Sequence, residues 1–211
     1  MDSPFYNNNR YLRFDMPALK YDILKLLVAD PEEWPVFIET GTLRGETIFA
    51  MEPWFDELHT IELGKDLWSR VKGRYRGERI RFHLGDSPCV LRELLPTITR
   101  RAIFFLDGHW SCGVTARGNQ DVPLMEEIGV IARCFKHEAV LVIDDLRLFG
   151  QGPATGEAVD WSEIGRSGVR EAAGERMVLL EERRDLDKLV VRLAAGGGGS
   201  PPADGAQLCK G

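Results

Sequence analysis

Five short apolar runs recur between residues 36 and 144, and helix-compatible stretches separate them. The runs read VFIE, LHTIE, RIRFHL, AIFFLD and AVLVID, at residues 36–39, 58–62, 79–84, 102–107 and 139–144. The stretches between them cover residues 45–53, 65–75, 88–97 and 121–136. Near-continuous apolar runs are typical of strands buried on both faces, and alternation with helices implies right-handed crossovers between parallel strands. The pattern therefore predicts a parallel sheet covered by helices.

The two ends of the pattern differ from its middle. Residues 17–29 place apolar side chains at helical spacing, with Pro17 at the start, where a helix tolerates proline. After a Gly-, Pro- and Ala-rich loop, a helix is predicted from Ser162, as its N-cap, to Ala173. The runs RMVLLEER and KLVVRLA follow, and the short turn from Asp185 to Asp187 between them favours an antiparallel hairpin. The predicted fold is Rossmann-like and doubly wound, with a mostly parallel sheet and a C-terminal antiparallel hairpin.

The composition is that of an ordinary globular protein. The chain has 211 residues, 44% of them hydrophobic and 28% charged, which suits one domain with a full core. We assign residues 17–195 to a single domain, residues 1–16 to an aromatic N-terminal arm or lid, and residues 196–211 to a flexible Gly- and Pro-rich tail. The net charge of -6 argues against a nucleic-acid partner bound through its phosphates.

The sequence also carries expectations about location and assembly. No apolar run is long enough to span a bilayer, and the polar, aromatic start does not resemble a secretory signal, so we expect a cytoplasmic protein without a membrane partner. The four cysteines lack the paired short spacing of a zinc site or a disulfide framework, so isolated reduced thiols are expected. A homo-oligomer is compatible with the sequence.

The first predicted strand ends in a glycine loop, Glu39-Thr40-Gly41-Thr42-Leu43-Arg44-Gly45. Open α/β sheets bind ligands at the carboxyl ends of their strands. Gly41 allows a tight turn and a close approach of the backbone to a ligand, and Gly45 lets the next helix start against the strand. The loop lacks the G-x-G-x-x-G spacing of dinucleotide folds, which makes a nicotinamide or flavin enzyme less favoured.

The second and third predicted strands also end in polar residues. Glu62 lies about twenty residues beyond the glycine loop, where a carboxylate can accept hydrogen bonds from both ribose hydroxyls. A surface glutamate is the alternative. The triplet Gly85-Asp86-Ser87 follows the third strand and could meet an adenine edge, or could simply form a turn.

The fourth and fifth predicted strands deliver acids to the same edge of the sheet. Asp107 ends one run, and Asp144 and Asp145 end the other. Because neighbouring acids repel one another, a positive group is expected nearby. The three carboxylates offer the hard oxygen ligands that Mg²⁺ prefers. Acids that are open to solvent, or paired with Arg147, are the alternative.

The ordered series ETGTLRGET, TIEL, GDS, FLDGH and VIDD resembles the class I S-adenosylmethionine-dependent methyltransferases of the macrocin and novobiocin O-methyltransferase type, and the related cephalosporin hydroxylase group. The resemblance covers residues 36–149. It implies metal-assisted O-methylation of a small-molecule acceptor, with S-adenosyl-L-methionine and Mg²⁺ as cofactors. The cofactor-binding residues that it implies are Glu39, Gly41, Thr42, Glu62, Asp86 and Ser87. The metal ligands that it implies are Asp107, Asp144 and Asp145.

One position departs from that family. Many relatives have an acid two residues after the first metal ligand, whereas this chain has His109. O-methylation requires the attacking hydroxyl to lose a proton, and histidine titrates near neutral pH, where a general base works well. We therefore expect Asp107 and His109 to be the catalytic residues. A loop histidine bonded to a backbone carbonyl or a carboxylate is the alternative.

Other classes of function remain open. A cofactor-binding protein without transfer activity could keep this fold, and so could a metal-dependent enzyme of another class. The sequence has no G-x-S-x-G elbow for a hydrolase, and no obvious set of two histidines and a carboxylate for iron chemistry. The acceptor itself depends on the arm at residues 1–16 and on the loops at residues 110–120 and 146–160.

Overall fold

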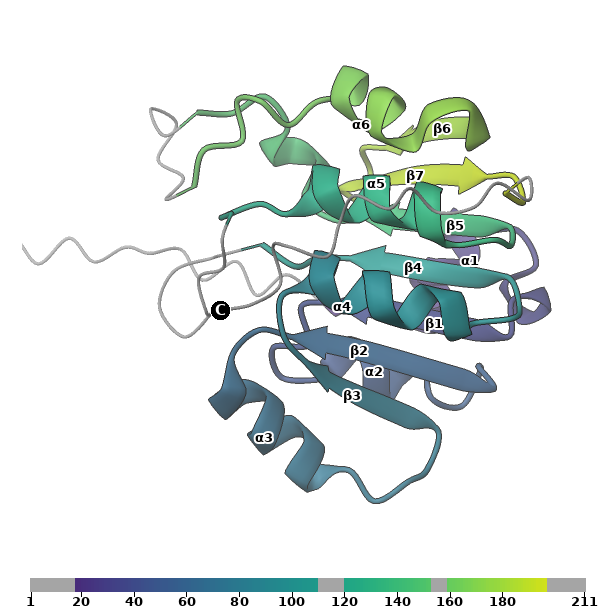
Figure 1. The fold of residues 1–211 in the computed structure, drawn as a ribbon, viewed down its shortest axis with the longest axis vertical. Coiled ribbons are helices and arrows are strands. Elements are labelled where there is room, and N and C mark those ends of the chain that lie inside the picture. Colours follow the sequence, from purple (N-terminus) through teal and green to yellow (C-terminus); the bar gives the residue numbers. More distant parts are fainter. Residues whose placement is uncertain (1–17, 110–119, 153–158, 197–211) are drawn as a thin grey trace, which may run out of the picture.

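Seven strands form one mixed sheet in the order β3-β2-β1-β4-β5-β7-β6 in a computed structural model that describes residues 18–109, 120–152 and 159–196 (Figure 1). The five strands in the first part of the chain pair in parallel, whereas β7 is antiparallel to both β5 and β6. The strands are β1 (Val36–Thr40), β2 (Glu57–Glu62), β3 (Ile80–Leu84), β4 (Ala102–Leu106), β5 (Ala139–Ile143), β6 (Met177–Arg183) and β7 (Lys188–Leu193). The predicted fold class, including the C-terminal hairpin, is confirmed.

The α-helices cover both faces of the sheet, and each face has its own hydrophobic core. They are α1 (Tyr21–Leu27), α2 (Glu46–Met51), α3 (Lys65–Arg74), α4 (Ser87–Leu94), α5 (Leu124–Cys134) and α6 (Arg166–Ala173). Alternate strand residues supply the two cores: Phe104 packs with α4, α5 and α6, while Ile103 and Phe105 pack with α1 and α2. This two-sided burial explains why the strands read as near-continuous apolar runs.

The helix predicted to start at Ser162 starts later, at Arg166. Residues 161–164 form a turn in which the Ile164 N–H donates to the Trp161 carbonyl, and both side chains are buried. Gly165 holds the N-cap position without a side-chain bond, so Ser162 is not the cap. The burial of Trp161 and Ile164 overrides the local capping preference.

Helix α5 is fixed at its C-terminal end by Arg176. The guanidinium donates to the carbonyl oxygens of Ala132, Phe135, His137 and Ala194 at 2.5–2.9 Å. The last carbonyls of a helix have no partners within the helix, so these bonds satisfy groups that burial would otherwise leave unpaired. The C-terminal end of α5 is thereby held against the start of β6.

Cys89 is disulfide-bonded, so the expectation of reduced thiols is wrong at this position. Pairing of two cysteines depends on how close the fold brings their Cα atoms, which sequence spacing does not report.

Within the described residues, every helix is too short or too polar to cross a membrane. The predicted arm at 1–16 and nearly all of the predicted tail lie outside the described residues.

A pair of stacked histidines on β2 and β3 makes stability depend on pH. His59 Nδ1 lies 3.0 Å from His83 Nε2, and His59 Nε2 lies 3.1 Å from Glu57 Oε1. Burial, with the neighbouring His59 and Arg81, lowers the pKa of His83 to about 4 from 6.5. The unfolded chain therefore takes up this proton at a higher pH than the folded protein does, and stability falls as the pH drops from 6.5 towards 4.

We expect the free energy of unfolding to fall by roughly 1–2 kcal/mol more in the wild type than in His83→Gln between pH 7 and pH 4.5. Urea unfolding at both pH values measures the difference. His137→Gln, a histidine outside this pair, should behave like the wild type. An equal fall in the wild type and in His83→Gln would contradict the expectation.

Candidate functional site

The site lies at the carboxyl ends of β1 and β4, where the order of the sheet reverses. The chain leaves β1 towards β2 and β3, and returns to β4 on the other side of β1. In open α/β sheets such a reversal opens a crevice at the carboxyl edge. Gly41, just after β1, has φ +84°, and an added Cβ would lie 2.4 Å from the carbonyl oxygen of Asp107. The glycine loop and the acid after β4 are therefore in direct backbone contact.

The second glycine of the loop serves a different contact from the one predicted. Gly45 has φ +75°, and a Cβ there would lie 2.6 Å from Val71 in α3 and 2.9 Å from Phe49 in α2. It thus lets α2 begin close to α3, whereas the sequence suggested packing against the strand. At both Gly41 and Gly45, the missing side chain makes room for other atoms of this protein.

A buried chain of hydrogen bonds runs beneath the glycine loop. The Thr60 hydroxyl donates to Glu39 Oε2 at 2.6 Å, and the Thr42 and Thr60 hydroxyl oxygens lie 2.5 Å apart. All three side chains are buried. Burial raises the pKa of Glu39 to about 8. Of the predicted cofactor residues, Glu39, Gly41 and Thr42 therefore share one structural unit.

Glu62 fixes the other side of the loop. Its Oε2 accepts from the Leu43 N–H at 2.9 Å and its Oε1 accepts from the Gly64 N–H at 2.8 Å. Leu43 has φ +46°, a left-handed conformation that is unfavourable for leucine, and the Glu62 carboxylate bonds to its amide. The carboxylate is thus oriented by the backbone at the end of β2, where the sequence predicted a ribose contact.

The Gly85-Asp86-Ser87 triplet leads into α4. Asp86 occupies the N-cap position, and burial together with the charge of Glu126 raises its pKa. The Ser87 hydroxyl donates to Glu127 Oε1 at 2.5 Å. Glu127, in the first turn of α5, is 1% exposed, and burial raises its pKa to about 7. Glu127 does not stand out in the sequence, because an acid in the first turn of a helix is ordinarily a surface residue.

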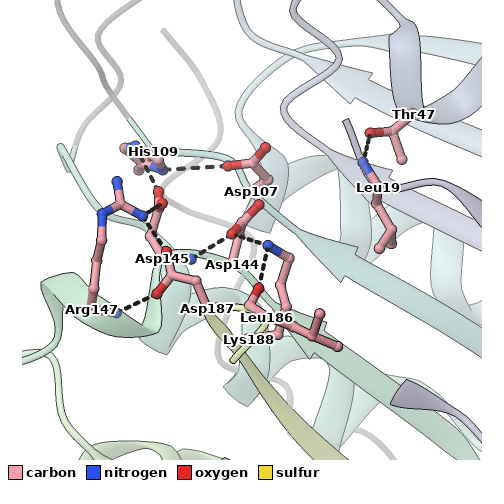
Figure 2. Close-up of polar contacts among 10 residues, drawn as sticks. All are labelled: Leu19, Thr47, Asp107, His109, Asp144, Asp145, Arg147, Leu186, Asp187 and Lys188. Atoms are coloured by element: carbon pink, nitrogen blue, oxygen red, sulfur yellow. Dashed lines mark hydrogen bonds and ion pairs between the residues drawn. The ribbon is translucent and has the colours of Figure 1, made fainter. Parts of the chain in front are cut away.

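The acids after β4 and β5 meet around His109 (Figure 2). His109 Nδ1 lies 3.6 Å from Asp107 Oδ1, and His109 Nε2 lies 3.3 Å from Asp145 Oδ2. One potential ligand atom from each of these residues falls within 4.8 Å of the others. Burial and the charges of Asp144 and Asp145 raise the pKa of Asp107. This cluster of carboxylate oxygens and an imidazole nitrogen could hold a divalent cation.

Two basic side chains also enter the cluster, as the repulsion between its acids requires. Arg147 lies 2.5 Å from Asp145 Oδ1 and contacts Asp187 as well. Lys188 Nζ lies 2.6 Å from Asp144 Oδ1 (Figure 2). Pairing of the acids with Arg147 was weighed from the sequence, whereas Lys188 was missed. The sequence carried no usable signal for it, because Lys188 reaches the carboxyl end of β5 only through the antiparallel pairing of β7 with β5.

A small cavity opens between the acids and the start of α5. It has about 10 Å³ of room for the centre of a water molecule, enough for about one water. Its polar lining is Asp107, His109, Asp144 and Glu127, and its apolar lining includes Leu106, Val122, Ile143 and Trp161. The His109 ring meets Trp161 edge to face, with centroids 5.2 Å apart. The loop at residues 110–119, which was expected to contact the acceptor, lies outside the described residues.

No protein-family model and no curated protein sequence matches the chain, but solved structures resemble its fold. The O-methyltransferase TomG of Streptomyces achromogenes, involved in tomaymycin synthesis and solved with S-adenosylmethionine, has a TM-score of 0.55 at 19% identity, over 85% of this chain and 82% of TomG. The N-methyltransferase NodS of Bradyrhizobium japonicum, solved with S-adenosylhomocysteine, has a TM-score of 0.50 at 14% identity, over 83% and 85% of the two chains. Spermidine synthase of Thermotoga maritima has a TM-score of 0.50 at 9% identity, over 82% of this chain and 59% of the synthase. The chain therefore has the Rossmann-like α/β fold of the S-adenosylmethionine-dependent methyltransferases.

Proposed function

We propose that this protein is an S-adenosylmethionine-dependent methyltransferase that methylates a hydroxyl group of a small molecule with the help of a divalent cation. The observation that carries the proposal is the contact between the glycine loop and the acidic cluster. Gly41 abuts the Asp107 backbone, and Asp107, His109 and Asp145 lie together beyond it. A cofactor held by the loop and an acceptor held by the cluster would thus be neighbours, as group transfer requires.

The residues of the glycine-loop side fit S-adenosylmethionine. Glu62, already oriented by two backbone amides, would accept hydrogen bonds from the ribose hydroxyls, and Asp86 and Ser87 would lie beside the adenine. Glu39 supports the loop through Thr60, with Gly41 and Thr42 lining the cofactor.

The acidic cluster would activate the acceptor. A divalent cation, when bound, acidifies a hydroxyl group that it contacts. Asp107 and Asp145 would supply carboxylate oxygens to it, and Mg²⁺ suits such ligands. His109 would receive the hydroxyl proton at a ring nitrogen instead of binding the cation, with its Nδ1 facing Asp107 and its Nε2 facing Asp145. The two acids would then stabilise the imidazolium that forms, much as an acid stabilises the histidine of a catalytic triad.

Two other functions are compatible with the same fold. The likeness to spermidine synthase indicates that this fold is not restricted to proteins named as methyltransferases. An enzyme of another class, or a binding protein without transfer activity, would use the same glycine loop.

Isothermal calorimetry with S-adenosylmethionine and S-adenosylhomocysteine, with and without Mg²⁺, tests the proposal. We expect both ligands to bind, and Glu62→Gln to weaken both by about tenfold, since one charged acceptor for the ribose is lost. Glu171→Gln, an exposed glutamate on α6, is the matched control and should bind like the wild type. Transfer of a labelled methyl group to a panel of hydroxylated small molecules then identifies the acceptor.

The same measurements can reject the proposal. Failure of both ligands to bind would exclude a methyltransferase of this kind. Binding of Mg²⁺ alone would favour a metal-dependent enzyme of another class. Tight binding of S-adenosylmethionine without transfer to any acceptor would favour a binding protein.

A further inference from the structure

Glu127 is a buried carboxylate that the proposed reaction does not use. Its side chain, in the first turn of α5, is 1% exposed. The neighbouring charges that raise its pKa are those of Asp86 and Glu126, both acids, and it is Glu126 that forms the ion pair with Arg92, at 2.6 Å. Burying an acid without a compensating cation is unfavourable. The fold by itself therefore gives no reason for a charged group at this position.

Glu127 lies where three segments of the carboxyl edge meet. Its Oε1 accepts from the hydroxyl of Ser87, the first residue of α4, at 2.5 Å. A Cβ added to Gly108, just after β4, would lie 3.1 Å from the same oxygen and 3.1 Å from Thr40 Oγ1, at the end of β1. Figure 1 shows α4 and α5 side by side on one face of the sheet. One buried carboxylate thus links the start of α4 to the ends of β1 and β4.

Each of these segments borders the candidate cofactor site. Thr40 directly precedes Gly41 of the glycine loop, and Gly108 directly follows Asp107, which that loop contacts. Ser87 is itself a candidate neighbour of the adenine, and a serine hydroxyl has only one proton, which Ser87 donates to Glu127. A charged acceptor makes such a bond stronger than a neutral acceptor does. The carboxylate therefore holds Ser87 more firmly than an amide could.

We propose that Glu127 is a positioning residue, which holds Ser87 and the start of α4 in place for the adenosine part of the cofactor. The inference rests on the proposed function, because it assumes that the adenine lies beside Asp86 and Ser87. Glu127 acts through Ser87 and not on the charge of the cofactor. S-adenosylmethionine, which carries a sulfonium charge, and S-adenosylhomocysteine, which does not, should therefore depend on Glu127 equally.

Calorimetry at pH 8 with both ligands tests the inference in Glu127→Gln. Since burial raises the pKa of Glu127 to about 7, the wild-type carboxylate is mostly ionised at this pH. Glutamine keeps an oxygen that can accept from Ser87 but loses the charge, so we expect binding of both ligands to weaken about fivefold. The melting temperature should equal or exceed that of the wild type, because a buried and uncompensated charge is removed. Weaker binding without loss of stability is not expected of a residue that merely supports the fold.

Two further variants show whether the effect passes through Ser87. In a Ser87→Ala background, Glu127→Gln should change the affinity by less than about twofold, because the pair acts through a single contact. Glu126→Gln is the matched control. It alters the neighbouring acid, which ties α5 to α4 through Arg92 instead of Ser87, and should bind both ligands within about twofold of the wild type.

Four results would overturn the inference. Affinities of Glu127→Gln within about twofold of the wild type would mean that Glu127 does not position the site. A loss confined to S-adenosylmethionine would mean that the carboxylate acts on the sulfonium charge. An undiminished loss in the Ser87→Ala background would mean that it acts by another route. A lower melting temperature of Glu127→Gln, or its failure to fold, would make Glu127 a structural residue.

Binding by the wild type separates this failure from failure of the proposed function. If the wild type and Glu127→Gln bind S-adenosylhomocysteine equally well, only the role of Glu127 is lost. If the wild type binds neither ligand, the proposed function itself is rejected.

Discussion

Asp107→Asn is expected to lower kcat for methyl transfer by about 10²–10³-fold while leaving S-adenosylmethionine binding within about twofold, because it removes charge at the reacting centre. The Asp107 carboxylate lies 3.6 Å from His109 and within reach of the same cation as Asp145. The glycine loop contacts the Asp107 backbone, which the substitution keeps. Steady-state kinetics with an identified acceptor, and calorimetry with S-adenosylmethionine, measure the two effects.

The same substitution should not destabilise the protein. Without a bound cation, burial and the charges of Asp144 and Asp145 raise the pKa of Asp107, so its ionised form is less favoured in the folded protein than in the unfolded chain. Replacing it with a neutral side chain of the same shape relieves that repulsion, and the melting temperature should equal or exceed that of the wild type. Asp66→Asn, at an exposed aspartate in the first turn of α3, is the control and should change neither property. Full activity of Asp107→Asn would remove Asp107 from the catalytic residues.

Gly41→Ala is expected to destabilise the protein by about 2–4 kcal/mol, from backbone strain and overlap together. The alanine Cβ would lie 2.4 Å from the Asp107 carbonyl oxygen, and φ is +84°. The loop must therefore move away from β4, which should also weaken S-adenosylmethionine binding by at least about tenfold. Thermal unfolding and calorimetry measure the two losses.

Gly73→Ala is the matched control for this substitution. Gly73 lies within α3, and an added Cβ there would have no neighbour within 4 Å. Because alanine is the better helix former, Gly73→Ala should stabilise the protein by about 0.5–1 kcal/mol. Equal effects of the two substitutions would mean that the contact between Gly41 and Asp107 does not hold the site together.

The sequence alone determined the fold class and the edge of the sheet where the site lies. Runs such as residues 102–106 are buried on both faces, and this burial is visible locally as an unbroken apolar stretch. Since parallel strands share one carboxyl edge, the positions of Gly41, Glu62 and Asp107 along the chain were enough to predict that they gather there. The roles of these residues remain predictions, which the experiments above address.

Only the tertiary structure decided which partners these residues have. Ser162 is a suitable cap by sequence, but the burial of Trp161 and Ile164 delays the helix to Arg166. Glu127 lies 40 residues from Ser87, and Lys188 lies 44 residues from Asp144. Neither pair leaves a local pattern, because side-chain bonds between distant segments depend on how the elements pack.

The acids Asp107, Asp144 and Asp145 show most clearly what the sequence predicts and what only the fold decides. Sequence placed Asp107, Asp144 and Asp145 at one edge and required a positive charge near them, because like charges at close range are unfavourable. It could not say that Lys188 pairs with Asp144, that Arg147 takes one oxygen of Asp145, or that His109 lies between Asp145 and Asp107. The Lys188–Asp144 pair follows from β7 inserting antiparallel beside β5, a long-range arrangement that only the folded chain specifies.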